Sequence, residues 1–270
     1  MTDSFPLRVY MSPVSDFSVY DQDTVLSQLS SRGRAKALRI KNRLIKNRSL
    51  TAEFLLMYAL TMAPGFTTDR CRHQENIWGF SEVPELEEEA DGKPYLRDHQ
   101  EIGFSLSHSG DYVLCAVGRG AVGADIQKRE PLKTDISARF YTDAERRYMS
   151  CCSDALMAFY HVWVLKESYV KYTGKGLAEG LESFSVVPEG MEADGCPMGM
   201  GAGRFTASGG FYTGGAFALD PAHNEGGRLK LSVFDMEEYA VGICHKGSIS
   251  GAPCMVDICL ITADRLKKAK

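Results

Sequence analysis

Two stretches of the chain follow one pattern, in which a tyrosine opens an apolar strand that contains a cysteine and ends in a glycine-bearing turn. They read "YVLCAVGRG" at residues 112–120 and "YAVGICHKG" at residues 239–247. A helical pattern precedes each stretch, at residues 25–62 and 154–172. The repeat indicates an α+β fold with two similar halves, each with its own antiparallel hairpin.

We expect residues 1–119 to form the N-terminal half, which carries a basic helix and the sequence "SHSG". Residues 120–270 are expected to form the C-terminal half. Within that half, residues 190–227 are unusually rich in glycine and are interpreted as an insertion.

Apolar runs of strand length predict strands at residues 7–11, 112–117, 121–126, 229–234 and 239–244. The segment Gly118-Arg119-Gly120 is expected to join the second and third of these strands as a hairpin. Thr142 and Glu145 stand three residues apart at the start of a helical pattern, which indicates a capping box.

The 270 residues carry a formal net charge of −4, which does not suit a protein that coats nucleic acid. A site for an anion must therefore come from local clusters of basic side chains.

None of the eight cysteines forms a Cys-x-x-Cys pair, and Cys115, Cys244 and Cys259 lie in apolar runs, as buried reduced thiols do. We see no secretory leader and no apolar run of membrane-spanning length, and expect a cytoplasmic protein without a membrane or nucleic-acid partner.

The segment "VGADIQK" places Asp125 and Gln127 two residues apart on a strand, so that both side chains leave by the same face. A carboxylate with an amide beside it can hold a hard cation, although a solvated strand end has the same sequence pattern. On the helix that follows, Glu167 and Lys171 are four residues apart, which is also the spacing of an ordinary surface ion pair.

The segment "GFSLSHSGDY" is interpreted as a turn rich in serine and glycine, in which Ser107 and His108 face a phosphate. A histidine with a purely structural role remains the alternative. A strand-borne Asp, a helix-borne Glu, a histidine and a basic helix together suit Mg²⁺ and a diphosphate, because Mg²⁺ takes one or two carboxylates plus phosphate oxygens.

The segments "FSLSHSGDY", "GADIQ" and "FYHVWVLKESYVKYTGKGL", in this order and with "DGKPYL" upstream, resemble the signature motifs of the 4′-phosphopantetheinyl transferases. The resemblance extends over about residues 30–187 and is strongest to the larger single-chain type that activates surfactin synthetase and similar enzymes. This type implies a pseudo-dimer of two similar α/β halves, each an antiparallel sheet packed with a long helix. It implies an Mg²⁺-dependent transfer of the phosphopantetheine arm of coenzyme A to a serine of an apo acyl, peptidyl or aryl carrier protein, with release of 3′,5′-ADP.

The resemblance also implies roles for individual residues of the metal site. Asp125 and Glu167 match the carboxylates that bind Mg²⁺, and Gln127 stands where many members have a further carboxylate. Glu167 is the expected base for the serine hydroxyl, and Lys171 matches the lysine placed against the pyrophosphate. Asp125, Glu167 and Lys171 are therefore the expected catalytic residues.

A second group is expected to bind coenzyme A. Ser107 and His108 match the residues that grip its 3′-phosphate end. The remaining expected coenzyme contacts are Lys36, Arg48, Lys93 and Lys166.

Other functions remain open at this point. A module that binds coenzyme A or a carrier protein without catalysis is the main alternative, although such a module has no need of the metal carboxylates. An oxidoreductase suggested by "GMGAGRF" lacks the full glycine spacing. An acyltransferase that uses coenzyme A thioesters would need a nucleophile or base that the sequence does not present. With both halves in one chain, we expect a monomer.

Overall fold

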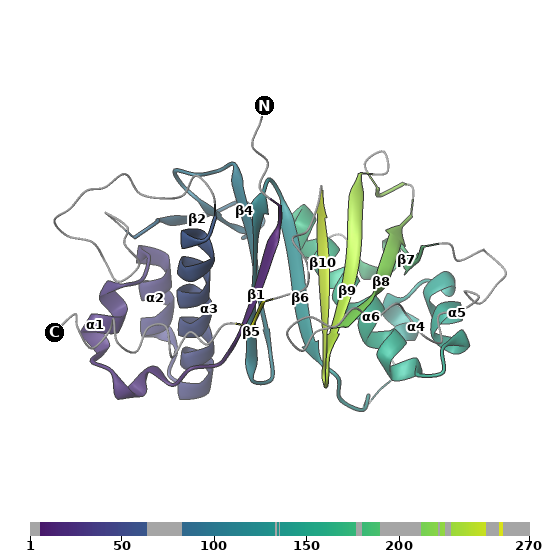
Figure 1. Cartoon of the computed structure of the whole chain (residues 1–270), viewed down its shortest axis with the longest axis horizontal. Helices are drawn as coiled ribbons and strands as arrows, with labels where there is room; N and C mark the ends of the chain where they lie inside the picture. The colour runs from purple at the N-terminus through teal and green to yellow at the C-terminus, as the bar shows by residue number, and fades with distance from the viewer. Residues whose placement is uncertain are drawn as a thin grey trace. The chain divides into compact units, whose positions relative to one another are not determined.

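A computed structural model describes residues 6–63, 83–132, 134, 136–176, 180–189, 212–220, 222–224, 228–246 and 254–255. The chain divides into two compact units. The first consists of residues 1–120 together with 254–270, and the second of residues 121–253. Figure 1 shows a sheet with helices in each unit. Among the described residues, no helix is long and apolar enough to cross a membrane.

The first unit contains a four-stranded sheet with the order β11-β1-β5-β4. These strands are β1 (Arg8–Pro13), β4 (Ile102–Ser109), β5 (Tyr112–Arg119) and β11 (Cys254–Met255). All neighbours are antiparallel except β1 and β11, which are parallel. A small hairpin of β2 (Leu86–Glu88) and β3 (Pro94–Leu96) completes the strands of this unit.

The helical pattern of residues 25–62 forms three helices and not one. They are α1 (Gln22–Ser27), α2 (Ser31–Arg39) and α3 (Arg43–Thr61), preceded by the short 3₁₀ helix η1 (Phe17–Val19). Ser30 caps α2 and Asn42 caps α3, each by accepting a hydrogen bond from a backbone N–H of the first turn. These two caps divide the pattern, and α3 alone packs on β1 and β5.

The second unit contains a five-stranded antiparallel sheet with the order β6-β10-β9-β8-β7. Its strands are β6 (Val122–Lys128), β7 (Val186–Pro188), β8 (Tyr212–Leu219), β9 (Leu229–Met236) and β10 (Tyr239–Lys246). Its helical elements are α4 (Ser137–Phe140), α5 (Asp143–Cys151), α6 (Ala155–Thr173) and the 3₁₀ helix η3 (Leu181–Ser183). The long helix α6 packs on β6 and β10.

Several local predictions are confirmed. Thr142 and Glu145 form the capping box of α5. Asp154 caps α6, and Gly174 ends it in the left-handed conformation, with φ of 79°. The mixed α/β class with antiparallel sheets is confirmed as well.

Two expectations about strands are wrong. The segment around Gly118 does not join a hairpin, because β5 pairs with β4 and β1 while β6 pairs with β10 in the other sheet. An apolar run shows that a strand is buried but does not show which neighbour it pairs with. The glycine-rich residues 190–227 are also not wholly an insertion, since β8 pairs with β7 and β9 inside the sheet. Most of the other residues of that segment lie outside the described part.

The cysteines follow the prediction in part. Cys115, Cys152 and Cys244 are free thiols, and burial raises the pKa of Cys115. Cys151, at the end of α5, is instead disulfide-bonded. Cys259 lies outside the described residues.

Two glycines allow the backbone of α6 to touch the sheet. A Cβ atom built on Gly123 of β6 would lie 1.8 Å from the carbonyl oxygen of Ser168, and one built on Gly242 of β10 would lie 2.4 Å from that of Val164. A Cβ atom essentially never lies within 3.0 Å of a heavy atom outside its own residue and the two residues next to it in the chain. The absence of a side chain at both positions therefore sets the distance between α6 and the strands.

We predict that Gly123→Ala lowers the free energy of unfolding by about 3 kcal/mol or more, because its methyl group overlaps helix backbone that cannot turn aside. Gly33→Ala is the matched control, since its methyl group would meet the end of the Glu53 side chain. Urea unfolding of both variants measures the difference. Equal stabilities for Gly123→Ala and the wild type would show that α6 does not depend on this contact.

A buried carboxylate in the first unit generates a prediction about pH. Glu53 of α3 is 4% exposed, and its Oε2 atom has no hydrogen-bond partner among the described residues. Burial raises the pKa of Glu53, while Arg32 and Lys36 act to lower it. A carboxyl whose folded pKa is raised stabilises the fold in its protonated form, and this contribution is lost as the pH rises through the folded pKa.

Glu53→Gln is therefore expected to be more stable than the wild type at about pH 8, and the two stabilities are expected to converge as the pH falls toward the ordinary carboxyl pKa of 4.5. Urea unfolding at a series of pH values measures this. A stability difference that does not change with pH would contradict the assignment of an uncompensated charge to Glu53.

Candidate functional site

Asp125 lies within β6, where its side chain is almost fully buried and opposite Gly242 of β10. The Nζ atom of Lys171 is 2.7 Å from the Oδ1 atom of Asp125 and 3.2 Å from the carbonyl oxygen of Ala124. A strand and a helix that are distant in sequence thus bring one carboxylate and one ammonium into direct contact. The sequence placed both residues in this site, and the structure brings them together.

Gln127 lies two residues further along β6, on the same face as Asp125. Its Nε2 atom is 3.2 Å from the Oδ2 atom of Asp125 and donates a hydrogen bond to it. The two carboxylate oxygens of Asp125 therefore have different partners, a lysine on one and an amide on the other. This arrangement fixes the orientation of the carboxylate.

Glu167 approaches the same place from α6. Burial raises the pKa of Glu167, the nearby charge of Asp125 raises it further, and Lys171 acts to lower it. Two carboxylates thus share the field of one lysine, which leaves one negative charge without a counter-charge in this group. Such a group suits a divalent cation with oxygen ligands.

No cluster of three or more His, Cys, Asp or Glu side chains with metal-site geometry occurs among the residues that the structure describes. The group at β6 and α6 contains two carboxylates and an amide, so it falls below that number. Mg²⁺ commonly binds through one or two carboxylates and completes its shell with phosphate oxygens and water. The donor set therefore fits Mg²⁺ better than a cation that needs a full cage of protein ligands.

The first unit brings a second group together, around the end of the β4–β5 hairpin. The Nη2 atom of Arg48 donates a hydrogen bond of 2.8 Å to the carbonyl oxygen of Gly110. The Nε atom of Arg48 is buried and has no partner among the described residues. Ser107 and His108 precede Gly110 on β4, with Ser107 buried and His108 exposed.

The segment with His108 is a strand and not the turn that the sequence suggested. His108 pairs with Val113 of β5, and the hairpin turns at Gly110 and Asp111. Glycine and serine are frequent in turns, but here Ser105 and Ser107 are buried residues of β4. The strand points His108 to the solvent-exposed side, where an anion could reach it.

The structure places the other two expected contacts of the first unit on separate elements. Lys36 lies exposed on α2, and Lys93 lies in the turn between β2 and β3, where its carbonyl oxygen accepts a hydrogen bond from the N–H of Glu89. No described hydrogen bond or ion pair joins Lys36 to the group around Arg48.

The buried position of Lys166 does not suit the contact with coenzyme A that the sequence suggested. The side chain is fully buried, and its Nζ atom is 2.8 Å from the Oε1 atom of Glu145. It also donates hydrogen bonds of 2.6 Å to the carbonyl oxygens of Leu181 and Phe184. Lys166 is next to Glu167 in the sequence, but adjacent residues of a helix point in directions about 100° apart. The two side chains therefore lie on different faces of α6.

The pair of Lys166 and Glu145 is a structural element that joins α6 to α5. Burial lowers the pKa of Lys166 and raises that of Glu145, while their mutual attraction acts in the opposite direction for both. Glu145 also accepts hydrogen bonds from the backbone N–H groups of Thr142 and Val186. The capping-box pattern identified Glu145 from the sequence, but it did not indicate that Lys166 of α6 is its partner.

Lys166→Met is expected to lower the free energy of unfolding by about 3–5 kcal/mol, because it leaves a buried carboxylate unpaired. The double variant Lys166→Met with Glu145→Gln should regain at least about 1 kcal/mol, since it removes the lone charge. Urea unfolding measures both effects. Isothermal titration should show that the double variant still binds coenzyme A with unchanged affinity, whereas lost affinity in a folded protein would restore Lys166 to the coenzyme site.

A third buried charged cluster was not foreseen from the sequence. The Nε2 atom of His161 on α6 is 2.9 Å from the Oδ2 atom of Asp235 on β9, and Arg129 forms an ion pair with the same carboxylate. Arg129 directly follows β6, so the cluster joins three separate parts of the second unit. No local sequence pattern indicated this cluster, because it depends on contacts between distant parts of the chain.

Known proteins share a sequence pattern with the segment that contains β6 and α6. The sequence pattern of the 4′-phosphopantetheinyl transferase superfamily matches residues 121–192, which include β6 and α6. A 4′-phosphopantetheinyl transferase of Bacillus subtilis is 32% identical over 183 residues, which are 66% of this chain and 74% of that protein. The chain belongs to the 4′-phosphopantetheinyl transferase superfamily.

Two further relatives agree with this membership. A 4′-phosphopantetheinyl transferase of Bacillus pumilus is 33% identical over 186 residues, 66% of this chain and 72% of that protein. The 4′-phosphopantetheinyl transferase Sfp of Bacillus subtilis is 40% identical over 103 residues, 35% of this chain and 43% of that protein. The resemblance found in the sequence motifs is confirmed, and so is the expectation of an enzyme of this family.

Proposed function

We propose that the protein transfers the 4′-phosphopantetheine arm of coenzyme A to a serine of an apo acyl, peptidyl or aryl carrier protein and releases 3′,5′-ADP. The observation that carries this proposal is the group of Asp125, Glu167 and Lys171, in which two carboxylates and a lysine converge from β6 and α6. Membership of the superfamily supports it.

The metal in this proposal is Mg²⁺, held by Asp125 and Glu167 with Gln127 as a further oxygen ligand. Bound there, Mg²⁺ would supply the positive charge that a pyrophosphate needs as its bridging bond breaks. The surplus negative charge of this group supports the assignment, because an uncompensated carboxylate with a raised pKa gains from a cation beside it. Gln127, which now donates to Asp125, would turn its amide to present the oxygen.

The chain's own residues would carry out the proton transfers. Glu167 would accept the proton of the carrier serine, whose oxygen forms a bond to the phosphorus that bears the pantetheine. The bond from that phosphorus to the bridging oxygen breaks, and the oxygen leaves with 3′,5′-ADP. Lys171 would turn from Asp125 to that departing phosphate and donate a hydrogen bond to it.

In the same proposal, the first unit holds the 3′-phosphate end of coenzyme A. Arg48 supports this role, because its buried Nε–H has no partner among the described residues and its guanidinium reaches the turn beside His108. Ser107 and His108 offer hydroxyl and ring donors on the same hairpin. Lys36 and Lys93 would add positive charge without a fixed geometry.

The two units are proposed to be the halves of an internal pseudo-dimer, with a boundary near residue 120. Each has a hairpin, β4–β5 or β9–β10, and each has a long helix packed on its sheet. The strands β5 and β10 carry the two similar sequence stretches. The cytoplasmic location and the monomeric state stay predictions.

Intact-protein mass spectrometry of an apo carrier protein, incubated with the enzyme, coenzyme A and Mg²⁺, tests the function. We expect the carrier to gain one phosphopantetheine group with the wild type, and expect the gain to fall at least about a hundredfold with Asp125→Ala or in EDTA. Glu182→Gln, which changes an exposed carboxylate of η3, is the matched control and should leave the rate unchanged.

Coenzyme A binding by a folded protein without any gain on several carriers would contradict the proposal and favour a non-catalytic binding module. Transfer that persists at full rate in EDTA would instead contradict the metal assignment. Loss with Glu182→Gln as well would show that any loss of acidic charge impairs the protein, so that Asp125 has no special role.

Gln127→Glu is expected to retain transfer, because a carboxylate can occupy the position of the amide and adds negative charge for the metal. The Mg²⁺ concentration at half-maximal rate should fall, and steady-state rates at varied Mg²⁺ measure it. A folded Gln127→Glu protein without activity would show that the amide has a positive role, such as the hydrogen bond that it donates to Asp125.

A further inference from the structure

Positive charge is concentrated in one short part of the first unit. Between Asp23 and Glu53 the sequence contains no acidic residue and eight basic ones, although the whole chain has a net charge of −4. They are Arg32, Arg34, Lys36, Arg39, Lys41, Arg43, Lys46 and Arg48. Salt bridges to Glu88 and to Asp16 engage only Arg32 and Arg43, the latter at 4.0 Å. The other six form no ion pair with any residue that the structure describes.

A hollow of about 310 Å³ lies beside three of these cations, Lys41, Arg43 and Lys46. It is bounded by η1, α1, the end of α2 and the first turns of α3. Its apolar lining consists of Phe17, Tyr20, Val25, Leu26, Ala37 and Leu50. Among the described residues no carboxylate lines it, although that of Asp16 accepts hydrogen bonds from Ser18 and Asn47 of the lining. Its volume is at the lower end of the range of about 300–1,000 Å³ that is common for ligand sites.

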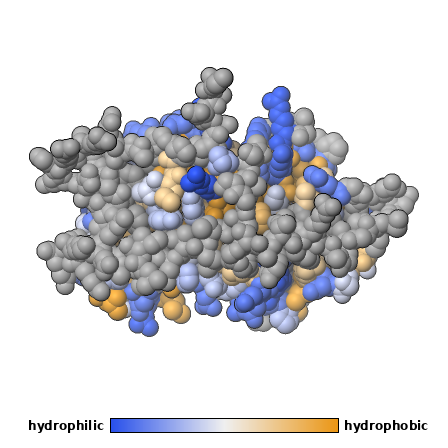
Figure 2. Space-filling view, viewed as in Figure 1, coloured by the Kyte–Doolittle hydropathy of each residue, from blue (hydrophilic) through white to orange (hydrophobic). Residues whose placement is uncertain are grey.

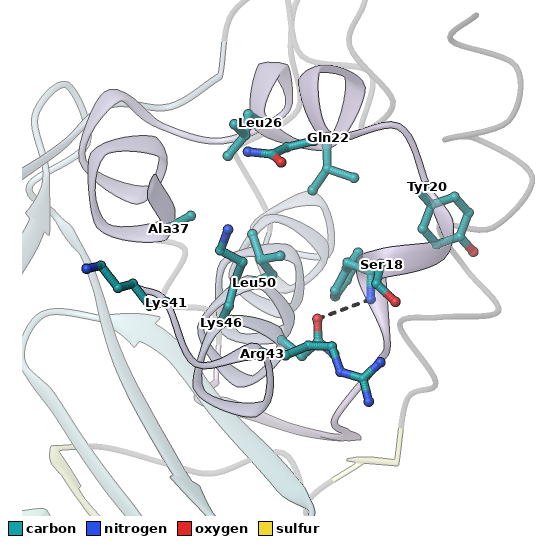
Figure 3. A pocket seen from close by; sticks show the side chains of 12 residues that line it. Ser18, Tyr20, Gln22, Leu26, Ala37, Lys41, Arg43, Lys46 and Leu50 are labelled. Atoms are coloured by element: carbon teal, nitrogen blue, oxygen red, sulfur yellow. Dashed lines mark hydrogen bonds between the residues drawn. The ribbon is translucent and has the colours of Figure 1, made fainter. Parts of the chain in front are cut away.

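The basic side chains take different positions around this hollow. Figure 3 shows the ammonium of Lys46 extending toward Gln22 and Leu26, across the space between α3 and α1. Lys41 lies to one side of the start of α3 and Arg43 to the other. Lys46 is half-buried and has no ion-pair partner among the described residues, so it would gain from an anion beside it.

The hollow is separate from the proposed coenzyme site. Its α3 residues, Arg43, Lys46, Asn47 and Leu50, follow helical spacing and share one face. Arg48 is two residues from Lys46, which places it about 200° around the helix, and it contacts Gly110 of the β4–β5 turn. Lys46 therefore has no part in the group around Arg48 and His108.

Exposed apolar side chains occur next to the lining residues in the sequence. Val19, Leu38, Leu44 and Ile45 are each more than half exposed, whereas the other exposed large apolar residues of the described chain, Met62 and Leu132, are less than half exposed. Figure 2 shows hydrophobic and hydrophilic atoms that project side by side at the lower left of the visible face. A partner for this region therefore needs negative charge together with apolar surface.

We propose that this hollow binds a small anionic amphiphile, a molecule with a phosphate-like or carboxylate head group and an apolar chain. The head group would lie between the ammonium groups of Lys41 and Lys46, and the chain would lie against Val25, Leu26 and Leu50. An inorganic anion would leave the apolar lining uncovered. A neutral apolar ligand would bury Lys46 without a counter-charge, at a cost in free energy.

Isothermal titration with decyl phosphate, kept below the concentration at which it forms micelles, tests this site. We expect one molecule to bind to the folded protein, and expect both inorganic phosphate and decyltrimethylammonium to bind at least about tenfold more weakly. Lys46→Met should weaken decyl phosphate about tenfold or more through loss of the charge. Leu26→Trp should weaken it by filling the hollow while every charge remains.

Lys230→Met, which removes an exposed lysine of β9 in the second unit, is the matched control and should bind like the wild type. The proposal is overturned if decyl phosphate does not bind, or if it binds equally to the wild type, Lys46→Met and Leu26→Trp. Circular dichroism of each variant, together with its phosphopantetheine transfer rate, separates local loss of the site from misfolding, since neither residue belongs to the proposed catalytic group.

Co-sedimentation with phosphatidylglycerol vesicles distinguishes a free amphiphile from a lipid in a membrane. Vesicle binding that is lost in both Lys46→Met and Leu26→Trp would support the site and assign it to a lipid head group. An acidic amphipathic peptide that binds in a Lys46-dependent way, with no binding of decyl phosphate or vesicles, would overturn the proposal in favour of a protein partner.

Discussion

The backbone of α6 lies directly on the backbone of β6 and β10, with no side chain between them at Gly123 and Gly242. A Cβ atom at Gly123 would meet the carbonyl oxygen of Ser168, which is one residue from Glu167. Gly123 itself is two residues from Asp125. Because Gly123 has no side chain, β6 and α6 lie in direct contact here. The same contact brings the carboxylates of Asp125 and Glu167 into one electrostatic field.

The helix α6 is buried on most of its circumference, so each of its charged or polar side chains has to find a partner on another element. Lys171 finds Asp125 on β6, Lys166 finds Glu145 on α5, and His161 finds Asp235 on β9. Two of these pairs are deeply buried and hold the helix in place. The third is partly open to solvent, since the Lys171 side chain is 29% exposed.

This difference in exposure distinguishes the Lys171 pair from the Lys166 pair. Lys166 and Glu145 are both fully buried, and three carbonyl or carboxylate oxygens take up the lysine hydrogens, so nothing remains to bind a ligand. At Asp125 a single, partly exposed lysine lies in the field of two carboxylates. A group in which carboxylates outnumber cations suits a divalent metal.

Much of this could be read from the sequence, and what could not has definite physical reasons. Periodicity and capping residues predicted α6 and the capping box at Thr142, because these depend on contacts within a few residues. The motifs placed Asp125 and Lys171 in one site. The pairing of β5 and β6 with different sheets, the burial of Lys166 and the cluster around Asp235 depend on contacts between distant parts of the chain.

The glycines of β6 and β10 are an intermediate case. A glycine inside an apolar strand indicates close approach of another backbone, and both "AVGAD" and "AVGIC" contain one. The sequence could not show that a single helix makes both approaches. Only the order of β6 and β10 as neighbours under α6 reveals that the two glycines act together.

The most direct test of this account is the anomalous diffraction of Mn²⁺ in crystals of the protein grown with 3′,5′-ADP. We predict a single Mn²⁺ peak in contact with the carboxylates of both Asp125 and Glu167, with the ammonium of Lys171 moved from Asp125 to a phosphate oxygen. A peak away from these carboxylates, or a Lys171 that keeps its contact with Asp125 while nucleotide and metal are bound elsewhere, would contradict the assignment of this group as the catalytic centre.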